Sequence, residues 1–204
     1  PKYSCRSCEK IVQAPAPVSA VARGKATFAT LAHVVVSKFD HHLPLYRQAE
    51  MMAAQGLEID RSTLAGWAGQ AAALLDPVVS RIRDEVLKAD KIHADDTPVP
   101  VLDTGRGKTA TGRLWVYAAD DQASGSTTPP ATWYRFTPDR TAAHPQAHLA
   151  GFRGFLQADA YAGYDALYRG GVTEVACWAH FRRKVFDLHE RLSTSLTTDI
   201  LERI

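Results

Sequence analysis

The sequence predicts an α/β protein in which a mixed sheet with packed helices follows an all-helical segment. Two observations support this fold class. From residue 27 to 88, apolar residues recur at spacings of three and four, which is the period of a helix. From residue 89 onward, short apolar runs bounded by Gly, Pro and Asp alternate with helical stretches. The resulting element order is β-β-β-α-β-α-β-α, which we expect to be incomplete at the C-terminal end.

The helical segment contains the outline of a helix-turn-helix. One helix is expected over residues 45–52, followed by a turn at Gly56 and a second helix capped by Asp60 or Ser62. Such a unit can contact DNA, or it can be a plain helical hairpin in a bundle. The candidate DNA contacts in it are Arg47 and Arg61.

The α/β part begins with three strands joined by short loops, which predicts an antiparallel meander. All five strands are expected over residues 92–102, 113–119, 132–136, 154–159 and 172–178. Pro98 and Pro100 indicate that the first strand is bent or lies on an edge. Helices are expected over residues 141–149, 164–168 and 179–204.

Composition is that of an ordinary globular protein. The 204 residues are 46% hydrophobic and 23% charged, with a formal net charge of +2. The sequence shows neither an apolar run of the roughly 20 residues that a membrane helix needs nor a signal peptide. We therefore expect a cytoplasmic protein without a membrane partner. Since the net charge is small, DNA binding would depend on local patches such as Arg182, Arg183 and Lys184.

The chain begins at Pro1 instead of Met, and we expect it to be a piece of a longer protein. Its three cysteines argue against a disulfide framework. Within residues 1–12, Cys5 and Cys8 form half of a zinc site, and tetrahedral zinc needs four ligands. We expect no stable structural zinc here, and a proline-containing linker over residues 13–26.

Two aspartates stand at the ends of predicted buried strands. Asp95 and Asp159 are separated by 64 positions, and they would face each other if the first and fourth strands are neighbours. Two carboxylates about 4 Å apart repel by roughly 4 kcal/mol at an effective dielectric of 20. A shared proton or a divalent cation would offset that repulsion, and oxygen ligands suit Mg²⁺ or Mn²⁺, two of which can cleave a phosphodiester. Aspartates at strand ends are also common in turns and helix caps.

Asp96 is the alternative to Asp95. Neighbouring residues on a strand point to opposite faces, so only one of the two can reach the site. The other would cap, or bond to Thr97 or to a backbone amide.

Several blocks of sequence, in order, resemble the insertion sequence 66 family of transposases. They are Leu31-Ala32-His33, Ser37 to Gln48, Arg61 to Trp67, His93 to Val99, Thr111 to Trp115, Leu156 to Tyr161 and Cys177 to Lys184. The resemblance implies a ribonuclease-H-like core with an Asp-Asp-Glu triad that cuts DNA at transposon ends and joins it to a target. It also implies self-association of the full-length protein.

Carried over by position, the first acid matches Asp95 and the second matches Asp159. The family commonly has Glu where this chain has Asp96, so that position is the more tolerant one. The third acid of the family has no counterpart here, which makes activity of this chain by itself doubtful. The family also carries an upstream cysteine pair that this chain lacks.

The segment Cys177-Trp178-Ala179-His180 is similar to a Cys-x-x-His element of several transposase families. It could support the active site or touch DNA. We favour a structural interpretation, in which Cys177 and Trp178 are buried in the core and His180 caps a helix. The adjacent Arg182, Arg183 and Lys184 are either phosphate contacts or a solvated helix face.

Three functions remain open at this point. The first is a transposase catalytic core using Mg²⁺ or Mn²⁺, active when the missing acid is supplied. The second is a DNA-binding or assembly fragment of a decayed transposase, without catalysis. The third is a metal-dependent nuclease or phosphatase of unrelated role.

Overall fold

The computed structural model describes residues 2–13, 19, 21, 24, 26–103, 105 and 107–204. The chain divides into two compact units, Pro1–Pro77 and Val78–Ile204. Each unit has its own cluster of buried apolar residues. The linker expected over residues 13–26 falls mostly outside the described residues. No described helix is both long enough and apolar enough to cross a membrane.

The first unit begins with a two-stranded hairpin, β1 (Lys2–Ser4) and β2 (Ile11–Gln13). Two helices follow, α1 (Phe28–Phe39) and α2 (Leu45–Ala54), and a turn at Gly56 leads into α3 (Arg61–Leu87). Gly56 has φ +81°, a conformation that favours glycine. The buried residues of this unit are Val21, Ala26, Leu31, Val34, Leu64, Trp67 and Ala71.

Helix α3 belongs to both units. It continues past Pro77 to Leu87, and the unit boundary lies at Pro77, not at the end of the helical segment. The reason is packing: Val86 is fully buried in the core of the second unit, and Ile82 and Leu87 pack against that core. The helical periodicity alone could not reveal this division.

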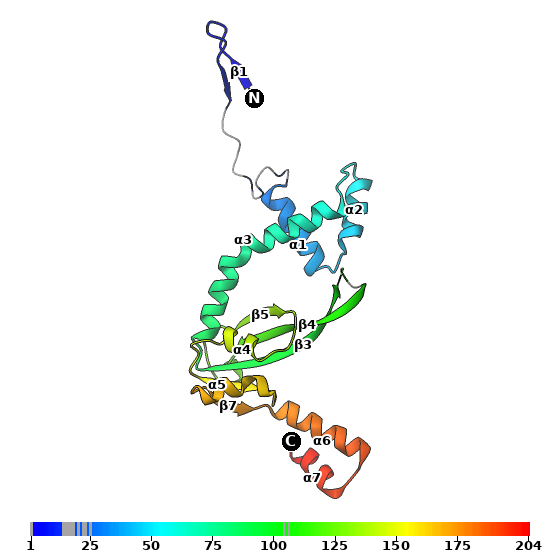
Figure 1. The fold of residues 1–204 in the computed structure, drawn as a ribbon, viewed down its shortest axis with the longest axis vertical. Helices are drawn as coiled ribbons and strands as arrows, with labels where there is room; N and C mark the ends of the chain where they lie inside the picture. The colour runs from blue at the N-terminus through cyan, green and yellow to red at the C-terminus, as the bar shows by residue number, and fades with distance from the viewer. Residues whose placement is uncertain are drawn as a thin grey trace. The chain divides into compact units, whose positions relative to one another are not determined.

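The second unit contains a five-stranded mixed sheet of order β5-β4-β3-β6-β7 (Figure 1). Its strands are β3 (Lys91–Asp103), β4 (Lys108–Ala119), β5 (Ala131–Thr137), β6 (Phe155–Ala158) and β7 (Thr173–Ala176). The first three form the expected antiparallel meander, and β6 and β7 add in parallel to β3. The predicted α/β class, strand order along the chain and mixed sheet are confirmed.

The position of β3 corrects one expectation. Pro98 and Pro100 predicted a strand that is bent or lies on an edge, whereas β3 is the central strand in the sheet order. The parallel partner β6 pairs only with residues 91–93 of β3. Beyond that point β3 has a partner on one side only, β4, and proline is tolerated at such an edge-like position.

Short helices cover one face of this sheet. They are α4 (Ala143–His148), η2 (Ala162–Tyr164) and α5 (Asp165–Arg169), and the buried residues between helices and sheet include Ile92, Ala94, Trp115, Tyr117, Leu149, Leu156, Ala158 and Tyr164. The short helix η1 (Gln122–Ser124) contributes no buried residue. The opposite face carries exposed apolar side chains, among them Leu114, Tyr134 and Phe136. Strand alternation therefore sets which residues enter the core.

The last segment is a pair of helices, α6 (Trp178–Arg191) and α7 (Ser195–Arg203). Figure 1 shows β7 leading into α6, which extends beyond the sheet. The strand expected over residues 172–178 ends at Ala176, and Trp178 stands in the first turn of α6. Trp178 is 67% exposed, so the expectation that it is buried in the core is wrong.

Candidate active site

The parallel pairing of β3 with β6 confirms that the first and fourth strands are neighbours. Its register joins Ile92 to Leu156 and His93 to Gln157. The same offset, continued two residues beyond the last pair, would set Asp95, the fifth residue of β3, level with Asp159, which directly follows the end of β6. Loops at such strand ends commonly carry functional groups on a rigid scaffold.

Asp95 and Asp96 point to opposite faces of β3, as alternation requires. Asp96 follows the buried Ala94 on the core face, and its side chain is 1% exposed. Asp95 is exposed, and its Oδ1 accepts a hydrogen bond from the backbone N–H of Asp96 at 2.8 Å. In the described part of the chain, no lysine or arginine forms an ion pair with Asp95.

The carboxylate of Asp96 is held by two arginines. Arg113 donates from Nη1 to Oδ2 at 3.0 Å. Arg140 donates from Nε to both oxygens, at 2.9 and 3.1 Å, and its Nη2 lies 2.8 Å from Oδ1. Such charge-assisted bonds satisfy an acid that would otherwise be costly to bury. Both carboxylate oxygens of Asp96 are thus bonded to arginine side chains.

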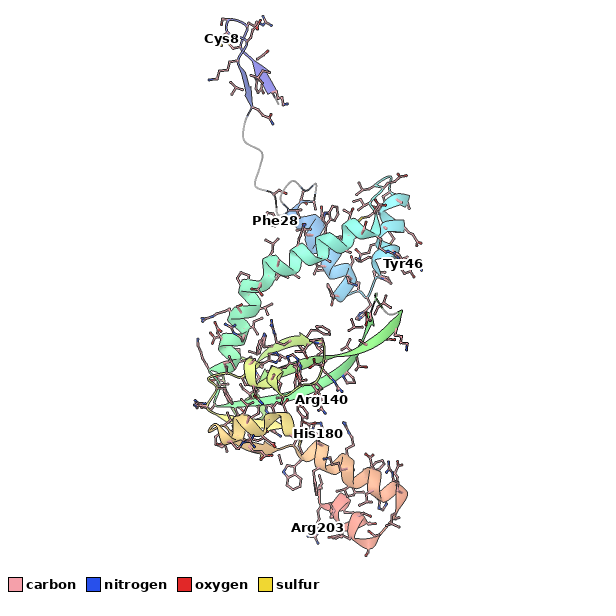
Figure 2. The ribbon with its side chains drawn as sticks, in the orientation of Figure 1. Cys8, Phe28, Tyr46, Arg140, His180 and Arg203 are labelled. Carbon is pink, nitrogen blue, oxygen red and sulfur yellow. The ribbon has the colours of Figure 1, made fainter. Side chains whose placement is uncertain are left out.

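Asp159 is tied to the same network through Arg140, labelled in Figure 2. Arg140 Nη2 donates to Asp159 Oδ2 at 3.2 Å, and the backbone N–H of Tyr161 donates to Oδ1 at 3.3 Å. The Asp159 side chain remains 26% exposed. Its carboxylate therefore has a fixed orientation and an accessible edge.

Arg140 is itself held in place by Tyr161. Its guanidinium lies over the Tyr161 ring at 4.1 Å, and the Tyr161 hydroxyl donates to the backbone oxygen of Arg140. Burial by itself lowers the pKa of Arg140, but the hydrogen bonds and charges of Asp96 and Asp159 outweigh it and raise the pKa above the ordinary value. Arg140 is therefore a permanent cation that joins a buried acid to an accessible one.

Sequence reasoning missed Arg113, Arg140 and Tyr161. A signal existed for Arg113, because the two-residue period of a strand puts it on the same face of β4 as the buried Trp115 and Tyr117. An arginine on the core face of a strand calls for a buried acid on the next strand. Arg140 and Tyr161 lie in loops, where no periodicity indicates the direction of a side chain.

A hollow of about 160 Å³ adjoins Asp159. Its lining includes Cys177, His180 and Lys184, which belong to the start of α6. Cys177 is the N-cap residue and is partly buried, but neither its side chain nor that of His180 makes a capping hydrogen bond to α6. His180, labelled in Figure 2, has a buried Nδ1 without a hydrogen-bond partner in the described structure.

The remaining basic candidates are more scattered. Arg182 and Arg183 are exposed on α6 next to Lys184, but only Lys184 lines the hollow at Asp159. In the first unit, Arg47 lies 3.5 Å from Glu50 on α2, and Arg61 begins α3. These two arginines are exposed, as a DNA contact would require.

The cysteines Cys5 and Cys8 are free and exposed in the turn of the β1–β2 hairpin. The side-chain hydrogen bond with Ser7, at 3.3 Å, and further bonds to Ser7 and Cys8 amides lower the pKa of the Cys5 thiol to about 6. Among the described residues, no group of three or more His, Cys, Asp or Glu side chains is arranged to hold a metal ion.

The carboxylate oxygens of Asp95 and Asp159 are of the kind that Mg²⁺ and Mn²⁺ bind. These ions commonly use one or two protein carboxylates and complete their shell with water and substrate phosphate. Asp95 is exposed and Asp159 has an accessible edge, whereas Asp96 is enclosed by two guanidinium groups. Asp95 and Asp159 are thus the accessible carboxylates, whereas Asp96, on the face of β3 opposite to Asp95, shares Arg140 with Asp159.

Comparison with protein families matches residues 23–204 to the family described as "Transposase IS66 family". The chain belongs to the IS66 family of transposases. Three curated relatives from Sinorhizobium fredii, the uncharacterized proteins y4hP, y4qI and y4jD, are 42%, 40% and 41% identical to it. The alignments cover 92%, 98% and 92% of this chain. They cover 34%, 38% and 38% of the relatives, so this IS66-family chain spans little more than a third of their length.

Proposed function

We propose that this chain carries part of the active site of a transposase that cuts and joins DNA strands in a reaction dependent on divalent cations. The observation that carries the proposal is the parallel pairing of β3 with β6, whose offset, continued two residues past the last pair, would set Asp95 beside Asp159. The mixed sheet and its helices support a ribonuclease-H-like core for this site.

Asp95 and Asp159 would hold Mg²⁺ or Mn²⁺, which supplies activation of the attacking water or hydroxyl and stabilisation of the leaving oxygen. Arg140 orients Asp159 through Oδ2, and the Tyr161 amide orients it through Oδ1. Asp96 fixes Arg140, in the manner of an outer-shell acid that supports a ligand. A third carboxylate would have to come from outside the described residues.

DNA is the proposed substrate and partner. Lys184 stands at the hollow beside Asp159, where it can contact a backbone phosphate. Arg182 and Arg183 extend this basic surface along α6. Arg47 and Arg61 would contact DNA through the helical pair α2 and α3 of the first unit. Self-association of the full-length transposase, to hold two ends, is part of the same proposal.

The test is a nicking assay on transposon-end DNA with a protein of the relatives' length, with and without Mg²⁺ or Mn²⁺. Asp95→Asn and Asp159→Asn should each abolish cation-dependent cleavage. The exposed Asp165 on α5 offers a matched control, and Asp165→Asn should cleave like the unchanged protein. Cleavage that survives both site substitutions would refute the proposal.

A second candidate function is DNA binding without catalysis, favoured by the absence of a group of three metal-ligand side chains among the described residues. Salt-dependent DNA binding that is unchanged by Asp95→Asn and Asp159→Asn, with no cleavage under any condition, would support it.

A further inference from the structure

Two aromatic side chains at the start of α6 are exposed side by side. Trp178 is 67% exposed and Phe181 is 46% exposed, and their rings meet edge to face with centroids 5.7 Å apart. The other three tryptophans of the chain are at most 8% exposed. An exposed aromatic pair of this kind is a common feature of surfaces that bind flat ligands.

The pair stands between three hollows that share Phe181. The first is the hollow of about 160 Å³ at Asp159. The second, of about 240 Å³, is lined by Ala176, Cys177, Trp178 and Phe181. The third, of about 500 Å³, lies between Trp178 and the C-terminal end of α7 at Arg203. A surface thus leads from the carboxylate site across both aromatic rings to a basic side chain.

Charge is arranged at the two ends of this surface. Lys184 lines the first hollow, and Arg203, whose Nε donates to both carboxylate oxygens of Asp199, lines the third. The walls around Trp178 are apolar. Asp159 and Glu174 also line the first hollow, so a phosphate there depends on Lys184 to offset the two carboxylates. A polyanion therefore fits best with a neutral base over the rings and its phosphates near Lys184 and Arg203.

One of the residues that line the first hollow, His180, has an unpaired polar atom. The Nδ1 atom of His180 is buried and has no hydrogen-bond partner in the described structure. Buried polar atoms are nearly always paired, so an unpaired one at a cavity indicates a ligand or water.

We propose that Trp178 and Phe181 stack the unpaired bases of single-stranded DNA beside Asp159. This inference rests on the proposed function, since it assigns the strand next to the cut to this surface. Aromatic rings flanked by basic side chains are the usual means of binding single strands without reading their sequence. Duplex DNA, whose bases are stacked on each other, cannot use these rings.

The experiment uses tryptophan fluorescence, which is selective here because Trp178 is the one tryptophan of the four that is exposed. Single-stranded oligothymidine, added in EDTA so that no cleavage occurs, should quench the emission and protect it from acrylamide. A hairpin duplex of equal length should do neither. Trp178→Ala, followed by fluorescence anisotropy of a labelled oligonucleotide, should weaken single-strand binding between about 5-fold and about 150-fold.

Matched variants separate stacking from other effects. Trp178→Phe should restore most of the affinity, and Phe181→Ala should weaken it by a similar factor. Tyr134, equally aromatic and 56% exposed on β5, is the control, and Tyr134→Ala should bind like the unchanged protein. Circular dichroism establishes that each variant is folded.

Three results would overturn the inference: equal quenching by duplex, equal loss of affinity in Tyr134→Ala, or a Trp178 that acrylamide cannot reach because another protein segment covers it. The test is independent of catalysis. Single-strand stacking that persists in a protein unable to cleave DNA leaves this inference standing and removes the proposed function. Cleavage by a protein that shows no single-strand stacking would support the proposed function and refute this inference.

Discussion

The neighbouring acids Asp95 and Asp96 should behave in opposite ways when each loses its charge. Asp96→Asn keeps the side chain's shape but removes the negative charge between Arg113 and Arg140, and its amide N–H₂ faces guanidinium donors. Removing one member of a buried ion pair costs about 3–5 kcal/mol. The two arginines are 24% and 34% exposed and can regain water, so we expect a loss of about 2–4 kcal/mol in the free energy of unfolding.

Asp95→Asn is the matched control, one residue away on the other face of β3. The exposed Asp95 accepts one backbone hydrogen bond, which an asparagine oxygen can also accept. We expect its free energy of unfolding to stay within about 0.5 kcal/mol of the unchanged protein. The same substitution should abolish cleavage, so stability and activity separate at adjacent positions.

Urea denaturation measures both variants, followed by the fluorescence of the buried Trp115 and Trp133 in the second unit. The denaturant slope must stay constant for the midpoints to report stability. A loss of less than about 0.5 kcal/mol in Asp96→Asn, or a larger loss in Asp95→Asn, would refute the division between a supporting acid and an open one.

Three further predictions follow from single contacts. Burial, with the charges of Arg135 and His144, lowers the pKa of His148 to about 4. Below about pH 6.5 the unfolded chain therefore binds a proton at His148 that the folded chain does not, and the free energy of unfolding should fall between pH 6.5 and 4 by about 1–2 kcal/mol, allowing for the partial exposure of His148. His148→Gln should flatten this pH dependence in thermal melts. Because hydrogen bonds lower the pKa of Cys5 to about 6, its alkylation rate, measured by mass spectrometry, should rise through pH 6, and Ser7→Ala should move the inflection upward. Trp115 is fully buried and donates to Thr137 Oγ1 at 2.7 Å, so Trp115→Phe should cost about 1–3 kcal/mol in urea melts, while a loss near zero would contradict the importance of that bond.

Much of the architecture followed from local pattern. The change from a helical to an alternating period separates α1–α3 from the sheet, and the apolar runs indicate all five strands within a few residues. The pairing of the first and fourth strands, which the strand order allowed, is also present between β3 and β6. These features were accessible because periodicity records which face of an element meets the core.

The site was predicted less completely. Asp95 and Asp159 could be named from the apolar runs that precede them, although Asp95 lies inside β3 and not at its end. The network of Arg113, Arg140 and Tyr161 could not be named. Trp178 was expected in the core because an apolar run continues from β7, whereas α6 begins at that residue. A short run of apolar residues does not indicate where a strand ends and a helix begins.

By itself, the sequence determined the type of each element, which residues of a strand share a face, and the family that the chain resembles. Only the tertiary structure decided that Asp96 is enclosed by two arginines while Asp95 stays open, and that α3 contributes to two cores. The physical reason is the distance along the chain over which each effect acts. Period and propensity act over a few residues, whereas Arg140 meets Asp96 across 44 positions of chain, and a contact of that kind exists only after the sheet has formed.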